Sequence, residues 1–295
     1  MSLIQSLEQS AMFFYLSVAI LGLIVGSFLN VVVYRLPIML QRSWRNDCLS
    51  FLEQENSTRE TTETFNLSTP RSRCPSCQHP ISAIENIPIL SYLFLKGRCR
   101  NCLSPISIRY PVVEFVTSVL SIMIAVHFGV TFQAGVALIF TWLLICLTLI
   151  DFDTQLLPDL ITLPLLWFAL YISLFNIFVD PTTAIIGALA GYLSLWSVFW
   201  LFKLSTGKEG MGYGDFKLLA AIGALLGWQM LPLVVMLSAF VGAVIGLTMM
   251  VCKGHDKNSP IPYGPYLSVA AFIALLWGDK INSMYISLLG CNPPC

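Results

Sequence analysis

Asp151 and Asp215 each stand at the edge of a long apolar run, in a chain with few charges inside such runs. Asp151 follows the run that ends at Ile150, and Asp215 closes the motif Gly212-Tyr213-Gly214-Asp215. A carboxylate at the edge of hydrocarbon is costly to keep, so it suggests a functional site. Two carboxylates brought together could share one proton and perform acid–base chemistry on a peptide bond.

The residues alone leave alternatives open for this pair. Asp153 could replace Asp151 as the partner of Asp215, because the two stand so close in sequence. Asp159, which follows Pro158, fits a helix cap at the membrane interface. Asp151 and Asp215 could also be caps, although that interpretation explains Asp215 poorly.

Three glycines, Gly210, Gly212 and Gly214, precede Asp215. Glycine permits a positive φ, close approach of two backbones, or a frayed helix start that admits water. A peptidase within the membrane needs such access, because its nucleophile is a water molecule.

The composition indicates an all-α integral membrane protein. Of the 295 residues, 56% are hydrophobic and 11% are charged, whereas soluble proteins carry about 25% charged residues. Apolar runs long enough for a bilayer span predict about eight transmembrane helices, of which the sixth and eighth are short. They lie near residues 12–34, 111–129, 134–150, 160–179, 183–202, 216–229, 231–252 and 264–278.

The basic residues predict the orientation. With eight spans, every Lys and Arg except Lys280 falls on one side of the membrane, which the positive-inside rule makes cytoplasmic. The N-terminus would then lie outside, and Asp151 and Asp215 would face the cytoplasm. No basic surface with interleaved aromatic residues indicates nucleic-acid binding.

The chain divides into a first transmembrane helix (1–35), a cytoplasmic loop (36–110) and a seven-helix membrane domain (111–295). The loop carries two CxxC pairs, Cys74 with Cys77 and Cys99 with Cys102. Each pair supplies two thiolates, and four thiolates suit tetrahedral zinc. Thiols stay reduced on the cytoplasmic side, so we predict a structural zinc site that folds this loop.

Several polar residues flank the loop. Asn30 and Arg35, at the end of the first span, could hold the loop or meet a substrate helix. Arg35 is equally explained by snorkelling to the interface. Glu114, near the start of the second span, suggests a partner base on another helix.

An ordered set of motifs covers nearly the whole chain and resembles the prepilin leader peptidases. The motifs are Gly26-Ser27-Phe28-Leu29-Asn30-Val31-Val32-Val33-Tyr34-Arg35-Leu36-Pro37, the CxxC pairs, Asn86-Ile87-Pro88-Ile89-Leu90-Ser91-Tyr92, Arg109-Tyr110-Pro111 with Glu114, Leu157-Pro158-Asp159, Gly212-Tyr213-Gly214-Asp215-Phe216-Lys217 and Pro262-Tyr263-Gly264-Pro265. In this family five residues separate the first catalytic aspartate from the Leu-Pro pair, which selects Asp151, and the second catalytic aspartate is that of the GxGD motif, Asp215. Tyr263 departs from the Phe that the family often has.

The resemblance implies a two-step enzyme of the bacterial inner (cytoplasmic) membrane with its active site facing the cytoplasm. It implies cleavage of prepilins and pseudopilins after a Gly, then methylation of the new N-terminal residue, usually Phe. S-adenosylmethionine would be the methyl donor, and zinc would occupy the four-cysteine loop.

The methyl-donor site is predicted less sharply, because the chain has no glycine-rich cofactor fingerprint of the Rossmann type. The resemblance links loop 36–110 to methylation, with a site near Asn86 and Tyr92. The alternative is that Asn86, Pro88 and Gly97 only shape the zinc-binding turn.

Two other functions compete with the peptidase. An ion- or proton-coupled transporter could use Asp151 and Asp215 along a pathway, but such proteins more often show mid-membrane polar residues and inverted repeats. A non-enzymatic assembly factor could use the zinc loop for docking.

Overall fold

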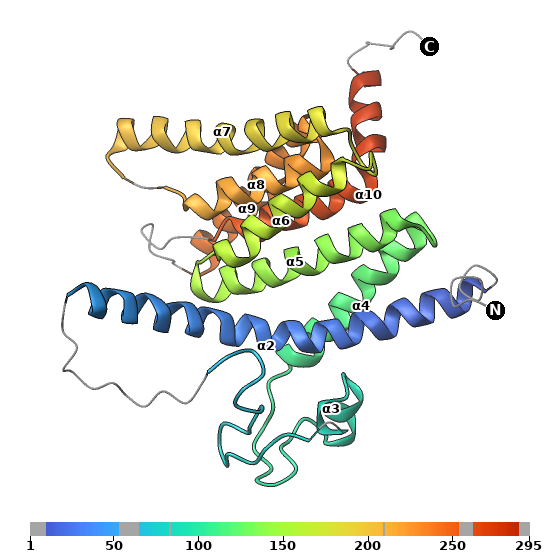
Figure 1. Cartoon of the computed structure of the whole chain (residues 1–295), viewed down its shortest axis with the longest axis vertical. Helices are drawn as coiled ribbons and strands as arrows, with labels where there is room; N and C mark the ends of the chain where they lie inside the picture. The colour runs from blue at the N-terminus through green and yellow to red at the C-terminus, as the bar shows by residue number, and fades with distance from the viewer. Residues whose placement is uncertain (1–9, 53–64, 83, 209, 254–261, 289–295) are drawn as a thin grey trace. The chain divides into compact units, whose positions relative to one another are not determined.

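The computed structural model describes residues 10–52, 65–82, 84–208, 210–253 and 262–288, and in these residues the structure is helical (Figure 1). Two isolated β-bridges are its only extended pairings among the described residues. The helices are α2 (Ala11–Phe51), α3 (Leu90–Phe94), α4 (Arg109–Phe128), α5 (Phe132–Thr154), α6 (Asp159–Ser173), α7 (Pro181–Thr206), α8 (Tyr213–Leu226), α9 (Leu231–Lys253) and α10 (Gly264–Leu288), with 3₁₀ turns at Ile84–Asn86 and Trp228–Met230.

The all-α membrane class is confirmed. Each of the eight predicted apolar runs coincides largely with one long helix. Within the described part of the chain, five helices are long and apolar enough to cross a membrane: α2, α4, α5, α7 and the segment Trp228–Thr248, which includes most of α9. The exact count of eight spans stays a prediction, because α6, α8 and α10 are not both long enough and apolar enough to cross a membrane by the same measure.

Helix α2 is much longer than its predicted span. It continues through Pro37 to Phe51, so the first part of the predicted loop is helical. Hydropathy marks where the membrane ends and not where the helix ends. The polar residues after Arg35 therefore concealed a helical extension.

The chain forms two compact units, one up to Val130 and one from Thr131 onward. In the first unit, α2 packs against α4 through two small residues. A Cβ on Gly22 would lie 2.7 Å from the Cα of Ser118, and a Cβ on Gly26 would lie 2.7 Å from the Cα of Glu114. This spacing is the small-xxx-small pattern of close membrane-helix packing.

In the second unit α8 lies at the centre. Its residues from Leu218 to Leu225 are all buried, because α6, α7 and α10 pack around it. Gly187 of α7 meets the backbone of Gly223 of α8 so closely that neither position has room for a side chain. This crossing fixes the position of α8, which carries Asp215.

Candidate active site and metal centre

Asp151 lies in the last turn of α5, and its side chain is buried. The helix ends just beyond it because Gln155 adopts a left-handed conformation, and the N–H of Gln155 bonds to the carbonyl of Asp151. The Oδ2 atom of Asp151 accepts a hydrogen bond of 3.0 Å from the backbone N–H of Gly264, at the start of α10. A buried carboxylate is thereby held against the backbone of a distant helix.

Asp215 lies in the first turn of α8 and is also buried. Among the described residues, its Oδ1 atom has no hydrogen-bond partner. Asp151 interacts electrostatically with Asp215, so the two carboxylates lie within charge–charge range. A buried carboxylate oxygen without a partner requires an explanation, and a catalytic role is a common one.

Leu157 connects the helix ends around the two carboxylates. A Cβ on Gly214 would lie 2.6 Å from the Cβ of Leu157, and a Cβ on Gly264 would lie 3.2 Å from its methyl groups. Of the three roles considered for the glycines, close approach is the one seen at Gly214. A positive φ is not found at Gly210, Gly212 or Gly214.

Sequence reasoning did not identify Gly264 as a site residue. Its signal was a glycine between two prolines, in Pro262-Tyr263-Gly264-Pro265, directly before an apolar run. A Cβ at this position would lie 2.7 Å from Oδ2 of Asp151. Only a glycine therefore lets the backbone N–H approach the carboxylate.

We expect Gly264→Ala to reduce cleavage of a model prepilin by about 100-fold, because displacing a catalytic group by about 1 Å costs this much. The measurement is kcat/KM with purified enzyme. Gly135→Ala in α5 is the matched control, since a Cβ there meets nothing within 4 Å. Full activity in Gly264→Ala would contradict the close contact.

Asp153 and Asp159 differ from Asp151 in their surroundings. Asp153 is exposed, whereas Asp151 is buried. Asp159 is the first residue of α6 and makes no side-chain cap, because Pro158 occupies the cap position. Instead, Asp159 Oδ1 lies 2.6 Å from Nζ of Lys217 in α8. The predicted cap at Asp159 is therefore wrong, and an ion pair takes its place.

We expect the Asp159–Lys217 pair to support the geometry of the α8 start. Because the pair is partly exposed, its contribution is small, and Lys217→Ala should reduce cleavage by about 2–5-fold. A double-mutant cycle with Asp159→Ala tests this coupling. If the two side chains act as a pair, the double variant loses less cleavage activity than the sum of the losses in the two single variants predicts. Additive losses would show that the two side chains act separately. Lys208→Ala, in an exposed loop, is the control.

The four loop cysteines come together as predicted. Their Sγ atoms all lie within 4.8 Å of one another, and the separations are 3.8 Å for Cys74–Cys102 and 4.0 Å for Cys77–Cys99. Tetrahedral zinc with bonds of about 2.3 Å places its sulfurs about 3.8 Å apart. A disulfide requires about 2.05 Å. The donor set therefore fits a tetrahedral metal and not disulfides.

Each CxxC pair lies on the same kind of short hairpin, an internal repeat that the sequence did not reveal. The N–H of Cys74 bonds to the carbonyl of His79, and that of Cys99 bonds to the carbonyl of Ser104, both at 2.9 Å. The β-bridges Arg73–Pro80 and Arg98–Pro105 close the two hairpins.

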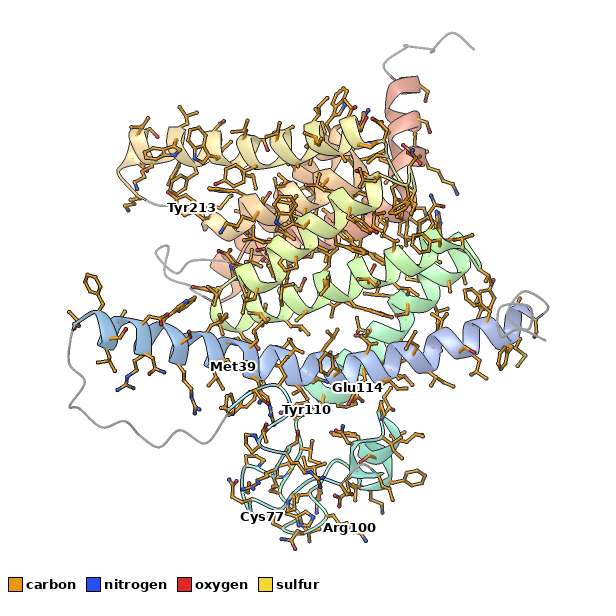
Figure 2. The ribbon with its side chains drawn as sticks, in the orientation of Figure 1. Met39, Cys77, Arg100, Tyr110, Glu114 and Tyr213 are labelled. Carbon is orange, nitrogen blue, oxygen red and sulfur yellow. The ribbon has the colours of Figure 1, made fainter. Side chains whose placement is uncertain are left out.

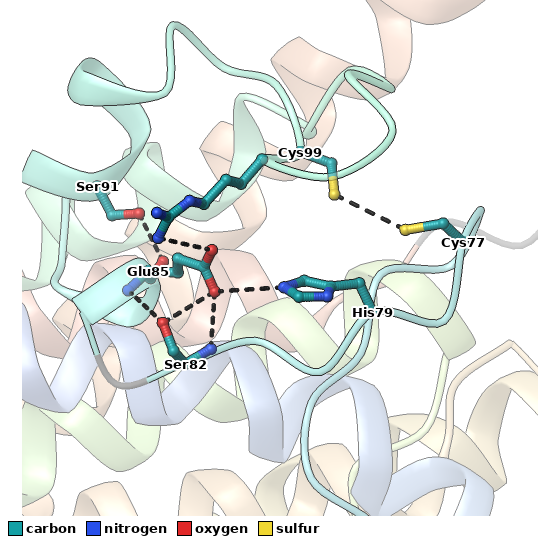
Figure 3. Close-up of polar contacts among 7 residues, drawn as sticks. Cys77, His79, Ser82, Glu85, Ser91 and Cys99 are labelled. Atoms are coloured by element: carbon teal, nitrogen blue, oxygen red, sulfur yellow. Dashed lines mark hydrogen bonds and ion pairs between the residues drawn. The ribbon is translucent and has the colours of Figure 1, made fainter.

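Glu85 connects the two hairpins (Figure 3). Its carboxylate accepts hydrogen bonds from the backbone N–H and the hydroxyl of Ser82, both at 2.9 Å. It also lies 4.0 Å from His79 and 3.9 Å from Arg100, which come from different hairpins. Figure 2 shows Cys77 and Arg100 at the end of the loop far from α2.

Residues of α2 hold the near end of the loop. Arg35 is buried and donates to the carbonyls of Asn66 at 2.9 Å and Pro70 at 2.6 Å. Asn30 donates to the carbonyl of Tyr110 at 3.2 Å. These contacts match a role of Asn30 and Arg35 in holding the loop, which was one of the roles that the sequence suggested.

The sequence suggested that Glu114 pairs with a basic side chain on another helix. The structure shows instead that it accepts hydrogen bonds from a backbone amide and a hydroxyl. Its Oε2 atom accepts from the N–H of Ile89 at 2.8 Å, and the hydroxyl of Ser27 donates to the same carboxylate. Figure 2 shows Glu114 beside α2. This contact holds Ile89 at a φ of 57°, which is unusual for a β-branched residue.

The chain matches two family models and many relatives. The model for the bacterial peptidase A24 N-terminal domain matches residues 20–128, and the model for the type IV leader peptidase family matches residues 138–247. No solved structure matches significantly.

Three similar proteins are each named prepilin leader peptidase/N-methyltransferase. Those of Aeromonas salmonicida and Pseudomonas aeruginosa are 52% and 51% identical to this chain, over 98% of it and 100% and 99% of their own lengths. That of Legionella pneumophila is 47% identical over 93% of this chain and 95% of its own length. These names give the transporter interpretation no support. The chain therefore belongs to the type IV leader peptidase family, within the group named prepilin leader peptidase/N-methyltransferase.

Proposed function

We propose that this protein cleaves the leader peptide from type IV prepilins and type II secretion pseudopilins after a Gly and then methylates the new N-terminal residue. The observation that carries the peptidase half is the pair of buried carboxylates, Asp151 and Asp215, which lie within charge–charge range. Family membership supports both halves. The peptidase half is an aspartic endopeptidase.

In the proposed cleavage, the dyad uses a water molecule as the nucleophile. An ionised aspartate removes one proton from the water, whose oxygen forms a bond to the scissile carbonyl carbon. The second aspartate, protonated, donates a hydrogen bond to the carbonyl oxygen. The resulting tetrahedral intermediate expels the amine, which takes up the proton that the first aspartate had removed from the water as the C–N bond breaks, so that this aspartate is ionised again. The two groups titrate as one coupled pair.

Hydrogen bonding supports an assignment of the two roles. Asp151 accepts from the N–H of Gly264, and a donor of this kind stabilises an ionised carboxylate. The carboxyl group of Asp215 also accepts a backbone hydrogen bond, from Gly212, but its Oδ1 atom is buried without a described partner, which suits a protonated carboxyl group that donates to the substrate. We therefore assign Asp151 as the base and Asp215 as the acid.

The methylation half belongs to loop 36–110 and uses S-adenosylmethionine, which supplies the methyl group to the N-terminal amine. Asn86 is exposed near the zinc-binding hairpins, and its amide could bind polar groups of the donor. Gly97 has a φ of +69°, and a Cβ there would lie 2.8 Å from the hydroxyl of Tyr92. Gly97 thus fits the alternative role of shaping the turn. Between Asn86 and Tyr92, we assign Asn86 to the donor because its amide is exposed.

Zinc bound by Cys74, Cys77, Cys99 and Cys102 would hold this loop in shape. The apolar helices place the protein in a membrane, and we propose the bacterial inner membrane with Asp151 and Asp215 facing the cytoplasm. Most basic residues lie on that side under the positive-inside rule.

The test is reconstitution of the purified protein with a full-length prepilin and S-adenosylmethionine. Mass spectrometry of the pilin N-terminus should show loss of the leader and gain of one methyl group. Without S-adenosylmethionine, the leader should be lost and the methyl group should be absent. An uncleaved pilin under both conditions would refute the proposal.

A further inference from the structure

One short stretch of the loop, segment 84–94, exposes several large apolar side chains close together in sequence. In segment 84–94, the exposed fraction is 82% for Phe94 and 75% for Ile84, and Ile87, Leu90 and Leu93 are also exposed. Leu90, Leu93 and Phe94 share one face of α3, at the i, i+3 and i+4 spacing of a helix. A contiguous apolar surface of this kind marks an interaction site.

The segment lies at the level of the membrane span and not beyond it. Ile89 bonds to Glu114, which Ser27 also contacts. Ser27 precedes Arg35, the first basic residue after the span, by a helical rise of about 12 Å. Figure 1 accordingly shows α3 next to the middle of α2 and not past its C-terminal end. With Arg35 at the headgroups, Ile89 lies well inside a hydrocarbon core of about 30 Å.

The backbone of the segment suits an apolar environment, where every polar group needs a partner inside the protein. The N–H of Ile89 bonds to Glu114, and the hydroxyl of Ser91 bonds to the carbonyl of Glu85. Further N–H groups bond within the segment: Ile87 to Ile84, Ser91 to Ile87, Leu93 to Ile89 and Leu95 to Ser91.

The helix that anchors the segment through Glu114 also exposes apolar side chains on either side of that residue. Val112 and Phe115 of α4 are exposed on a predicted membrane span. Lys96 and Arg98, directly after the segment, are exposed, and basic side chains at this place suit anionic headgroups.

We propose that residues 87–94 of this segment are inserted into the cytoplasmic leaflet of the bilayer, with their exposed apolar side chains against lipid chains, while the polar side chains of Glu85 and Asn86 stay on the aqueous side. Glu114 anchors them there through Ile89. The zinc-binding hairpins are then held against the membrane surface.

Photo-crosslinking of the full chain in nanodiscs of phosphatidylethanolamine and phosphatidylglycerol tests this proposal. Benzoylphenylalanine replaces Phe94 in one variant and Leu93 in a second. Phe51, 87% exposed near the end of α2, is the matched aqueous control, and Phe115 in α4 is the lipid-facing control. Retained cleavage and metal content show that each variant folds.

We expect lipid adducts at positions 94 and 93 at the level of position 115 and several-fold above position 51. Adducts at position 94 no more frequent than at position 51 would overturn the proposal. So would cross-links from position 94 mainly to a second copy of the chain, or loss of its lipid adducts when a prepilin is added, because each outcome assigns the surface to a protein partner. Failure of pilin cleavage in the wild-type protein would affect the proposed function and not this result.

Discussion

Asp215→Asn is expected to reduce cleavage of a model prepilin by at least about 1,000-fold, because a positioned acid or base contributes about 100- to 10,000-fold and the dyad acts as a unit. Asparagine keeps the shape of the side chain and loses its proton chemistry. Asp151→Asn should have the same effect, and the double variant should be little worse than either. The measurement is kcat/KM with purified, detergent-solubilised enzyme.

The matched control for the dyad is Asp153→Asn. Asp153 stands two positions after Asp151 but is exposed, so this variant should retain near wild-type cleavage. All variants should still methylate a pilin whose leader has already been removed, because methylation is assigned to the loop in the other compact unit. Cleavage that survives in Asp215→Asn would sink the aspartic-peptidase mechanism.

Loss of the metal is expected to abolish the structure of the zinc-binding loop. Structural zinc sites contribute about 10–16 kcal/mol of apparent binding energy, which is more than a loop of this size gains from its other contacts. Cys74→Ser or a strong chelator should therefore eliminate bound zinc, abolish methylation and weaken cleavage. Metal content by mass spectrometry and both activities are measured together.

Cys48→Ser is the control for metal loss, because Cys48 is an exposed cysteine of α2 outside the four-cysteine cluster. It should leave zinc and both activities unchanged. A metal-free protein with intact cleavage and methylation would contradict a structural metal.

The pH dependence of metal retention follows from Cys74. The backbone N–H groups of Cys77 and Ser76 lower the pKa of its thiol to about 6. The thiolate of Cys74 is therefore largely formed at pH 7 and is protonated as the pH falls through about 6, whereas burial and the hydrogen bonds with Cys74 and Cys102 raise the pKa of the Cys99 thiol. Zinc release measured with a chromogenic chelator should increase below that pH.

The membrane class, the four-cysteine cluster and the two aspartates that the structure brings together could be predicted from the sequence. The apolar runs required helices, because hydrocarbon leaves the backbone few other ways to satisfy its hydrogen bonds. The cysteine spacing predicted the four-thiolate cluster, because each CxxC turn presents two sulfurs to one ion. The sequence also pointed to Asp151 and Asp215, because a carboxylate at the edge of hydrocarbon is energetically costly and therefore suggests a function.

Several features of the fold could not be read from the sequence. The length of α2 beyond Arg35 was missed because hydropathy falls where the helix continues. The Asp159–Lys217 ion pair was missed because its two residues meet only through helix packing. The matching hydrogen bonds of the two hairpins were missed because they involve the backbone, which residue types scarcely reveal.

The sequence by itself determined which residue types stand at the membrane edge and which chemistry they can perform. Only the tertiary structure decided that Asp151 is buried against Gly264 while Asp153 is exposed, and that Glu114 holds the turn at Ile89. The physical reason is that sequence patterns report local preference and solvent, whereas burial and hydrogen-bond partners depend on which distant helices come into contact.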